Sequence, residues 1–183
     1  MVIWLLGLSG SGKTTLGWKL QSYLEDISIP NYMIDGDDAR SFFENDLGYS
    51  FKDRKTNLKR ILYGAHVLSK AGMVTIVCNI GPFEDIREFA RENLSDYKEV
   101  YLKCGIDECV RRDPKGVYKK NMGKTDIIGL EIEFAAPKTP DLILDTKIES
   151  EKESFEKLLD FFHGIDHPLV NKNVSRMKYH NII

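Results

Sequence analysis

Residues 7–14 of this 183-residue chain read GLSGSGKT and match the pattern G-x-x-x-x-G-K-[ST]. Its glycines allow successive backbone N–H groups to turn inward around a phosphate, and a following helix adds the positive end of its dipole. In such a loop Lys13 reaches the β- and γ-phosphates, and the Thr14 hydroxyl binds Mg²⁺. The loop therefore predicts a site for ATP with Mg²⁺. The residues predicted to contact ATP here are Gly7, Ser9, Gly10, Ser11, Gly12, Lys13, Thr14 and Thr15.

Two carboxylates, Asp35 and Asp37, follow the apolar segment Tyr32-Met33-Ile34. If that segment is a strand of an open α/β sheet, its carboxyl end faces the ligand crevice. A hydroxyl that accepts a phosphoryl group needs a carboxylate to orient it and take its proton, and Mg²⁺ needs oxygen ligands. The alternative is a solvated turn, because Asp-Gly is a common turn pair.

Four basic residues near a predicted helix form a second group, Arg40, Arg54, Lys59 and Arg60. Lys59 and Arg60 follow Arg54 by five and six positions in the predicted helix 53–71, so the three side chains cannot all lie on one face of that helix. Some of them are therefore expected to face solvent. Guanidinium groups match the geometry of phosphates, so at least one is predicted to bind an anionic acceptor.

Short apolar runs alternate with helical patterns along the chain, and the strands and helices that they predict must position the phosphate loop, the carboxylates and the basic residues. The predicted strands are 2–6, 31–34, 73–78, 100–102 and 142–144, and the predicted helices are 13–25, 53–71, 83–94, 106–112 and 151–162. Such alternation predicts a three-layer α/β domain, in which helices cover both faces of a parallel sheet of about five strands. The phosphate loop then lies at the end of the first strand.

Residues 113–137 lack clear periodicity and contain four lysines, which predicts a mobile basic lid over the phosphates. These lysines are Lys115, Lys119, Lys120 and Lys124. One domain is expected over residues 1–163, with this lid inside it. Residues 164–183 are polar and are expected to form a C-terminal tail.

The charge balance is 26 basic against 28 acidic residues, a formal net charge of −2. It gives no basic field for nucleic acid or a membrane surface, so neither is expected as a partner. The apolar N-terminus is six residues long before a glycine, too short for a signal peptide or a membrane span, which favours the cytoplasm. The three cysteines lack metal-type spacing, and buried thiols are expected at Cys78 and Cys104.

Five motifs occur in a fixed order along most of the chain. They are GLSGSGKTT from residue 7, IDGDDAR from 34, DLGYSFKDRKTNLKR from 46, RDPKGVYKK from 112 and PDLILDT from 140. With these motifs the chain resembles the adenylylsulfate kinase family from Leu5 to about Thr146. The resemblance implies a P-loop kinase fold and a homodimer. It also implies transfer of the γ-phosphoryl group of ATP to the 3′-hydroxyl of a nucleotide that bears an acidic anhydride.

The resemblance also implies roles for individual residues. Asp37 would face the acceptor hydroxyl and act in catalysis with Lys13, and Thr14 and Asp37 would hold Mg²⁺. Arg112 and Thr146 would border the adenine of ATP. The residues predicted to bind the acceptor are Asp35, Asp37, Arg40, Arg54, Asn57, Asn79, Ile80, Lys115, Lys119, Lys120 and Ile127.

Two segments depart from the family pattern. The family typically has Ser-Phe-Ile-Ser-Pro where this chain has CNIGP (78–82), and Phe-Thr-Gly-Ile where it has IIGL (127–130). Asn79 and Ile127 thus replace two phenylalanines that are thought to enclose the acceptor adenine. Gly81 replaces a serine that is phosphorylated in some members, which excludes a phosphoenzyme at this position.

These departures favour a small nucleotide acceptor other than adenylylsulfate, such as the cytidine diphosphoramidate of capsule synthesis. Asn79 and Ile127 cannot stack on a purine, whereas the Asn79 amide could pair with the edge of a base. Phe83, Tyr49 or Phe134 could instead supply the missing aromatic face. Two alternatives stay open. One is an ordinary adenylylsulfate kinase with a repacked base site, and the other is a nucleotide-dependent switch without an acceptor, against which the lid argues.

Overall fold

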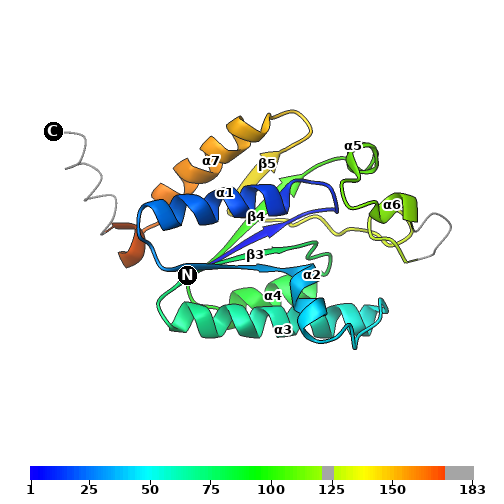
Figure 1. The fold of residues 1–183 in the computed structure, drawn as a ribbon, viewed down its shortest axis with the longest axis horizontal. Helices are drawn as coiled ribbons and strands as arrows, with labels where there is room; N and C mark the ends of the chain where they lie inside the picture. Colours follow the sequence, from blue (N-terminus) through cyan, green and yellow to red (C-terminus); the bar gives the residue numbers. More distant parts are fainter. Residues whose placement is uncertain (121–125, 172–183) are drawn as a thin grey trace.

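The computed structural model describes residues 1–120 and 126–171, which form a five-stranded sheet covered by helices on both faces (Figure 1). The strands are β1 (Val2–Leu6), β2 (Asn31–Asp35), β3 (Val74–Asn79), β4 (Tyr97–Lys103) and β5 (Leu142–Asp145). Their order is β2-β3-β1-β4-β5, and every neighbouring pair is parallel. The predicted three-layer α/β fold with five parallel strands is confirmed.

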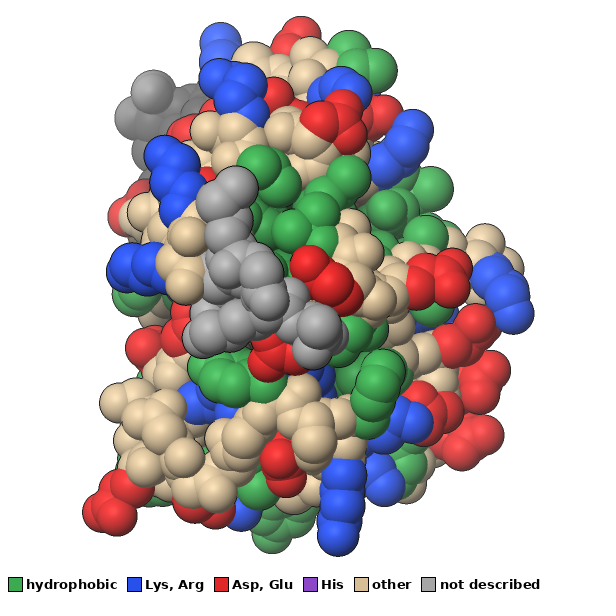
Figure 2. Space-filling view, turned by 90° about the vertical axis from the view of Figure 1, so that its right-hand side faces the viewer, with side chains coloured by type: hydrophobic (Ala, Val, Ile, Leu, Met, Phe, Trp, Pro, Cys, Tyr) green, Lys and Arg blue, Asp and Glu red, His purple; other side chains and the backbone are tan. Residues whose placement is uncertain are grey.

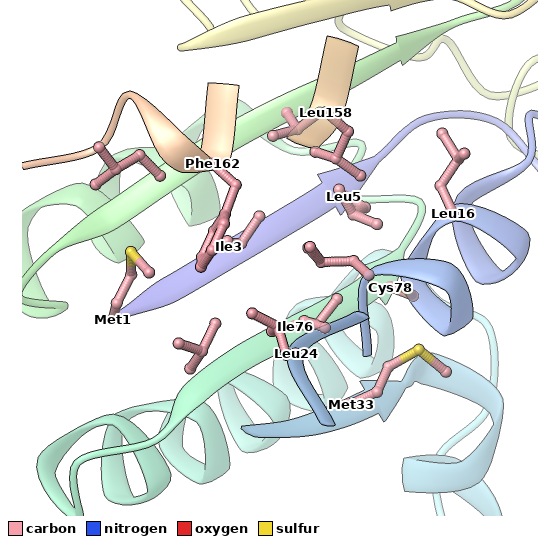
Figure 3. Close-up of a cluster of buried hydrophobic side chains, with 14 of the residues drawn as sticks. Met1, Ile3, Leu5, Leu16, Leu24, Met33, Ile76, Cys78, Leu158 and Phe162 are labelled. Atoms are coloured by element: carbon pink, nitrogen blue, oxygen red, sulfur yellow. The ribbon is translucent and has the colours of Figure 1, made fainter. Parts of the chain in front are cut away.

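Helices α1 (Lys13–Asp26) and α7 (Glu151–His163) cover one face, and α3 (Phe51–Lys70) and α4 (Glu84–Asn93) cover the other (Figure 1). Side chains alternate along β1, as they do along any strand. Ile3 and Leu5 pack against α1 and α7, where Leu16 and Phe162 meet them (Figure 3). Val2, Trp4 and Leu6 belong to the cluster on the α3 and α4 face. The central strand is thus buried on both sides.

Three short helices lie toward the carboxyl ends of the strands, α2 (Gly36–Phe42), α5 (Ile106–Arg112) and α6 (Val117–Lys120) (Figure 1). Helix α2 was not predicted, because Asp-Gly indicated a turn. In the structure Asp35 caps this helix, and its carboxylate accepts a hydrogen bond from the Asp37 N–H at 2.9 Å. Asp37 therefore lies in the first turn of a helix rather than in a loop.

The lid segment is more ordered than its lack of periodicity indicated. The carboxylate of Asp113 accepts hydrogen bonds from the backbone N–H groups of Tyr118 (3.2 Å) and Lys119 (3.0 Å), which begins α6. Tyr118 is 3% exposed and packs with Ile127 and Ile128 in a small cluster beside the phosphate loop. Lys124 lies outside the described residues, and the motion of the lid stays a prediction.

Two residues beyond the expected boundary at 163 pack into the main core, Ile165 and Val170. Residues 172–183 of the expected tail lie outside the described residues. Cys78, Cys104 and Cys109 are all buried and free, so the buried thiols expected at the first two positions are confirmed. Within residues 1–120 and 126–171, no helix is both long and apolar enough to span a membrane.

Candidate active site at the carboxyl ends of the strands

The phosphate loop (residues 7–14) connects β1 to α1 with a backbone that only glycine adopts easily. Gly10 and Gly12 have φ values of 78° and 99°, in the left-handed region. A Cβ atom on Gly10 would lie 3.0 Å from the carbonyl oxygen of Cys109, so α5 packs directly on the loop. The motif thus forms the cradle that the sequence predicted.

Lys13 lies inside this cradle and is only 9% exposed. Its Nζ donates a hydrogen bond to the carbonyl oxygen of Leu8 at 2.6 Å. Burial lowers the pKa of Lys13 to about 8, although the nearby Asp35 carboxylate opposes the shift. A buried ammonium group at this position can bind phosphate oxygens without much competition from water.

Thr14 and Asp35 form an oxygen-rich pair beside the lysine. The Thr14 hydroxyl donates to Asp35 Oδ2 at 2.9 Å. Hydroxyl and carboxylate oxygens are the ligands that Mg²⁺ prefers, and Mg²⁺ usually takes only one or two from the protein, with the rest from phosphates and water. Accordingly, the described residues contain no group of three or more His, Cys, Asp or Glu side chains that could hold a metal. The pair fits Mg²⁺, although the sequence had assigned Asp37 rather than Asp35 to the metal.

Asp37 instead pairs with the lid. Its side chain is 72% exposed, and Oδ2 accepts a hydrogen bond from Lys115 Nζ at 2.6 Å. Lys115 also lies 4.0 Å from Asp35 Oδ1. Partial burial disfavours the charge of Lys115, but the hydrogen bond to Asp37 and the charges of Asp37, Asp35 and Asp38 together outweigh burial and raise the pKa of this lysine. The lid thus contacts both carboxylates directly.

One cavity of about 950 Å³ extends from the phosphate loop to the second basic group. At its far end Arg40 and Arg54 lie on Tyr49, with their guanidinium carbons 4.7 and 5.1 Å from the ring centroid. Arg54 donates to the carbonyl oxygens of Tyr49 and Asp126, each at 2.7 Å. Tyr49 is 57% exposed and lines the cavity, whereas Phe83 and Phe134 do not. Of the three aromatic residues named as substitutes, Tyr49 alone offers a face here.

Asn79 and Ile127 also line the cavity, as the sequence predicted. Asn79 Oδ1 accepts a hydrogen bond from Trp4 Nε1 at 2.9 Å, and Asn79 Nδ2 is buried, with no partner among the described residues. Ile127 is 6% exposed and belongs to the cluster around Tyr118. The amide oxygen of Asn79 is therefore already used, and pairing of its Nδ2 with a base edge stays a prediction.

Arg112 and Thr146, which were predicted to border the adenine of ATP, contact each other. Arg112 donates to the carbonyl oxygen of Thr146 at 2.6 Å and to Glu108 at 2.7 Å. The Thr146 hydroxyl donates to the carbonyl oxygen of Ser11 at 2.9 Å, which ties the end of β5 to the phosphate loop. Both residues predicted to border adenine therefore lie beside the loop.

The structure brings nearly all of the predicted site residues into this one cavity. Gly7 does not line it but begins the loop, and its N–H donates to the carbonyl oxygen of Ile80 at 3.2 Å. Lys119 and Lys120 are exposed and do not line it either. Sequence reasoning missed Tyr118, whose buried hydroxyl donates to the carbonyl oxygen of Ser9 at 3.1 Å. The sequence did contain a signal, because an aromatic ring among the lysines of RDPKGVYKK indicates a residue that packs against the protein.

Figure 2 views the molecule from the side on which α5 and α6 lie in Figure 1. Acidic and basic side chains are intermixed across this face, with apolar groups between them (Figure 2). The visible face thus has no broad basic patch.

Comparisons with known proteins agree with this site. The family model described as "Adenylylsulphate kinase" matches residues 1–145. The adenylyl-sulfate kinase of Staphylococcus carnosus is 38% identical over 165 residues, 88% of this chain and 83% of the relative. The Mycobacterium tuberculosis APS kinase CysC, solved in complex with AMPPNP and APS, has a TM-score of 0.83 at 33% identity, over 89% of this chain and 97% of its own. An Acinetobacter baumannii shikimate kinase shares the fold, with a TM-score of 0.58 at 17% identity, over 88% of this chain and 92% of its own.

Proposed function

The chain belongs to the adenylylsulphate kinase family, and we propose that it transfers the γ-phosphoryl group of ATP to the 3′-hydroxyl of adenylylsulfate. Family and site together support an ATP-dependent nucleotide kinase. The acceptor is the part that we propose. The observation that carries the proposal is one cavity that is lined by the phosphate loop, by Asp37 and by the cluster of Arg40, Tyr49 and Arg54.

The acceptor favoured by the sequence, cytidine diphosphoramidate, is not supported by the comparisons, and neither is a role in capsule synthesis. Adenylylsulfate fits them better, because the relatives are named for it and one was solved with APS bound. The main argument against adenylylsulfate was the loss of two stacking phenylalanines. Tyr49 answers only part of that argument, because its exposed ring lines the cavity but Arg40 and Arg54 lie on the ring.

In the proposed reaction the two ends of the cavity hold the two nucleotides. Lys13 and the N–H groups of the phosphate loop bind the β- and γ-phosphates. Arg40 and Arg54 bind the charged anhydride of the acceptor, since their forks match phosphate and sulfate oxygens. Asp37 orients the 3′-hydroxyl and accepts its proton as the phosphoryl group is transferred.

Two further groups complete the proposed reaction. Mg²⁺, held by Thr14 and Asp35, would neutralise charge on the phosphates during transfer. Lys115 lies beside Asp37 and within the lid, so it can bind the transferred phosphoryl group while the lid excludes water. Phosphoryl transfer consists largely of such positioning and charge stabilisation.

An acceptor screen tests this proposal. Purified protein with ATP and Mg²⁺ is incubated with adenylylsulfate, with cytidine diphosphoramidate or with no acceptor, and the products are identified by mass spectrometry. We expect a 3′-phosphorylated product from adenylylsulfate, with little ATP consumed when no acceptor is present. A product from the cytidine compound alone would contradict the proposed acceptor. ATP hydrolysis that ignores both acceptors would favour the nucleotide-dependent switch.

Assembly and location remain proposals as well. The homodimer rests on the family resemblance, and analytical ultracentrifugation of the full chain tests it directly. A molar mass of one chain at micromolar concentration would contradict it. Location in the cytoplasm is tested by fractionation of the source cells.

A further inference from the structure

A buried pair of opposite charges, Arg87 on α4 and Glu99 on β4, does not line the cavity and has no part in the proposed reaction. Their side chains are 1% and 0% exposed, and Arg87 Nε lies 3.9 Å from Glu99 Oε1. Glu99 has closer partners, since Arg91 Nη2 lies 2.9 Å from each of its oxygens and the Tyr97 hydroxyl donates to it at 2.9 Å. Neutralising Glu99 therefore does not explain the burial of a second arginine, and a buried ion pair is weak evidence for stability.

The short contact of Arg87 is with the backbone. Its Nη1 donates to the carbonyl oxygen of Gly81 at 2.7 Å, while Nε and Nη2 have no hydrogen-bond partner among the described residues. Gly81 belongs to the segment 79–82, which follows β3 and which we call the acceptor loop. All four residues of the acceptor loop line the cavity.

The acceptor loop is held at three consecutive residues. Trp4 Nε1 donates a hydrogen bond to Oδ1 of Asn79 at 2.9 Å, and the N–H of Gly7 donates one to the carbonyl oxygen of Ile80 at 3.2 Å. Arg87 holds the third, Gly81. The second contact comes from the first residue of the phosphate loop, so the position of the acceptor loop is fixed relative to the γ-phosphate site.

Gly81 also limits where the acceptor loop can go. Its φ is 58°, and a Cβ atom there would lie 3.0 Å from Trp4 Cζ2 and 3.3 Å from Leu6 Cβ. The backbone is therefore already in contact with β1 on one side. The hydrogen bond from Arg87 holds the carbonyl oxygen of the same residue, Gly81.

We propose that Arg87 is a positioning residue, which holds the acceptor loop in the shape that receives the acceptor nucleotide. The proposal depends on the proposed function for the identity of the acceptor. The geometry of the acceptor loop does not depend on it. A deleted charge-assisted hydrogen bond of this kind is expected to weaken acceptor binding about tenfold or more.

The test compares Arg87→Met and Arg87→Lys with the matched control Arg91→Met. Arg91 contacts the same carboxylate but not the acceptor loop. Two readouts are used, the KM values for ATP and for adenylylsulfate, and hydrogen exchange of the peptide that covers residues 79–86. We expect Arg87→Met to raise the KM for the acceptor about tenfold, to change the KM for ATP less than twofold, and to speed exchange in that peptide. Arg91→Met should change neither the KM for the acceptor nor hydrogen exchange in that peptide.

Equal KM values for the acceptor in Arg87→Met and the unchanged protein, with unchanged exchange in residues 79–86, would overturn the proposal. So would a matching effect of Arg91→Met. If Arg87→Met does not fold, Arg87→Lys decides, because it keeps a cation beside Glu99 but shortens the reach to Gly81. If the protein does not use adenylylsulfate, the proposed function fails, and hydrogen exchange alone still decides the role of Arg87.

Discussion

The two ends of the active-site cavity are built in different ways. The phosphate end is one contiguous loop, whose backbone conformation is fixed by glycines and by burial against α5. The acceptor end is assembled from α2, α3, the acceptor loop and the lid, and long side chains hold it together. Arg54, for example, reaches across 72 residues to the carbonyl oxygen of Asp126. A substitution at the phosphate end should therefore lower kcat, whereas a substitution at the acceptor end should raise the KM for the acceptor.

The largest expected effect is at the phosphate end. Lys13→Ala removes the buried ammonium that would bind the transferred phosphoryl group, and we expect kcat to fall about a thousandfold. Circular dichroism should show an unchanged fold. Lys19→Ala is the matched control on the same helix, since Lys19 is exposed and pairs only at the surface with Glu151. Near-normal turnover in Lys13→Ala would remove the distinction between the two ends.

Asp37 lines the same cavity, and its substitution should lower kcat, as substitutions at the phosphate end do. Asp37→Ala removes the proposed base, and we expect kcat to fall about a hundredfold while the KM for ATP changes little. Steady-state kinetics with both substrates varied will measure this. Asp38→Ala, at the exposed neighbouring position, should stay within twofold of the unchanged protein. An Asp37→Ala protein with full kcat would show that another group takes the proton.

Arg54→Met tests the acceptor end. The substitution keeps much of the apolar stem but removes the guanidinium that lies on Tyr49 and binds Asp126, so we expect the KM for the acceptor to rise about thirtyfold. The KM for ATP should remain within twofold. Arg60→Met serves as control, because Arg60 pairs with Asp46 and does not line the cavity. A rise in both KM values would mean that the two ends are not separable.

The smallest expected effect is a pH dependence limited to the phosphate end. Burial lowers the pKa of Lys13 to about 8, and the protonated form is the one that binds phosphate. Affinity for ATP should therefore be constant below this pH and decrease above it, by about fourfold between pH 7 and 8.5. Titration calorimetry at several pH values measures this. Acceptor affinity should not change over this range, because arginines stay protonated.

A loss of ATP affinity that begins only above pH 10 would contradict the lowered pKa of Lys13. A parallel loss at the acceptor end would indicate that some group other than Lys13 titrates. In either case the phosphate end would not differ from the acceptor end in the way that its burial predicts.

The sequence determined the sheet and the phosphate loop, since both depend on local pattern. Apolar runs marked all five strands, although β4 begins at Tyr97 rather than at residue 100, because its first residues, Tyr97-Lys98-Glu99, are not an apolar run. The loop takes its shape from glycines within eight consecutive positions. Helix α3 begins at Phe51 rather than at residue 53, because the Ser50 side chain caps it, a local signal that was present but not used. Helix α2 was missed because Asp-Gly indicates a turn unless the preceding aspartate caps a helix, as Asp35 does.

Only the tertiary structure decided which polar groups are free to meet the acceptor. The letters CNIGP present Asn79 as an available amide, but Trp4, 75 positions away, accounts for its oxygen. Lys115 meets Asp37 across 78 positions, and Tyr49 becomes the aromatic face of the cavity because Arg40 and Arg54 flank it. Hydrogen bonds and ring contacts between distant segments depend on how the layers pack, and no spacing within one segment encodes them.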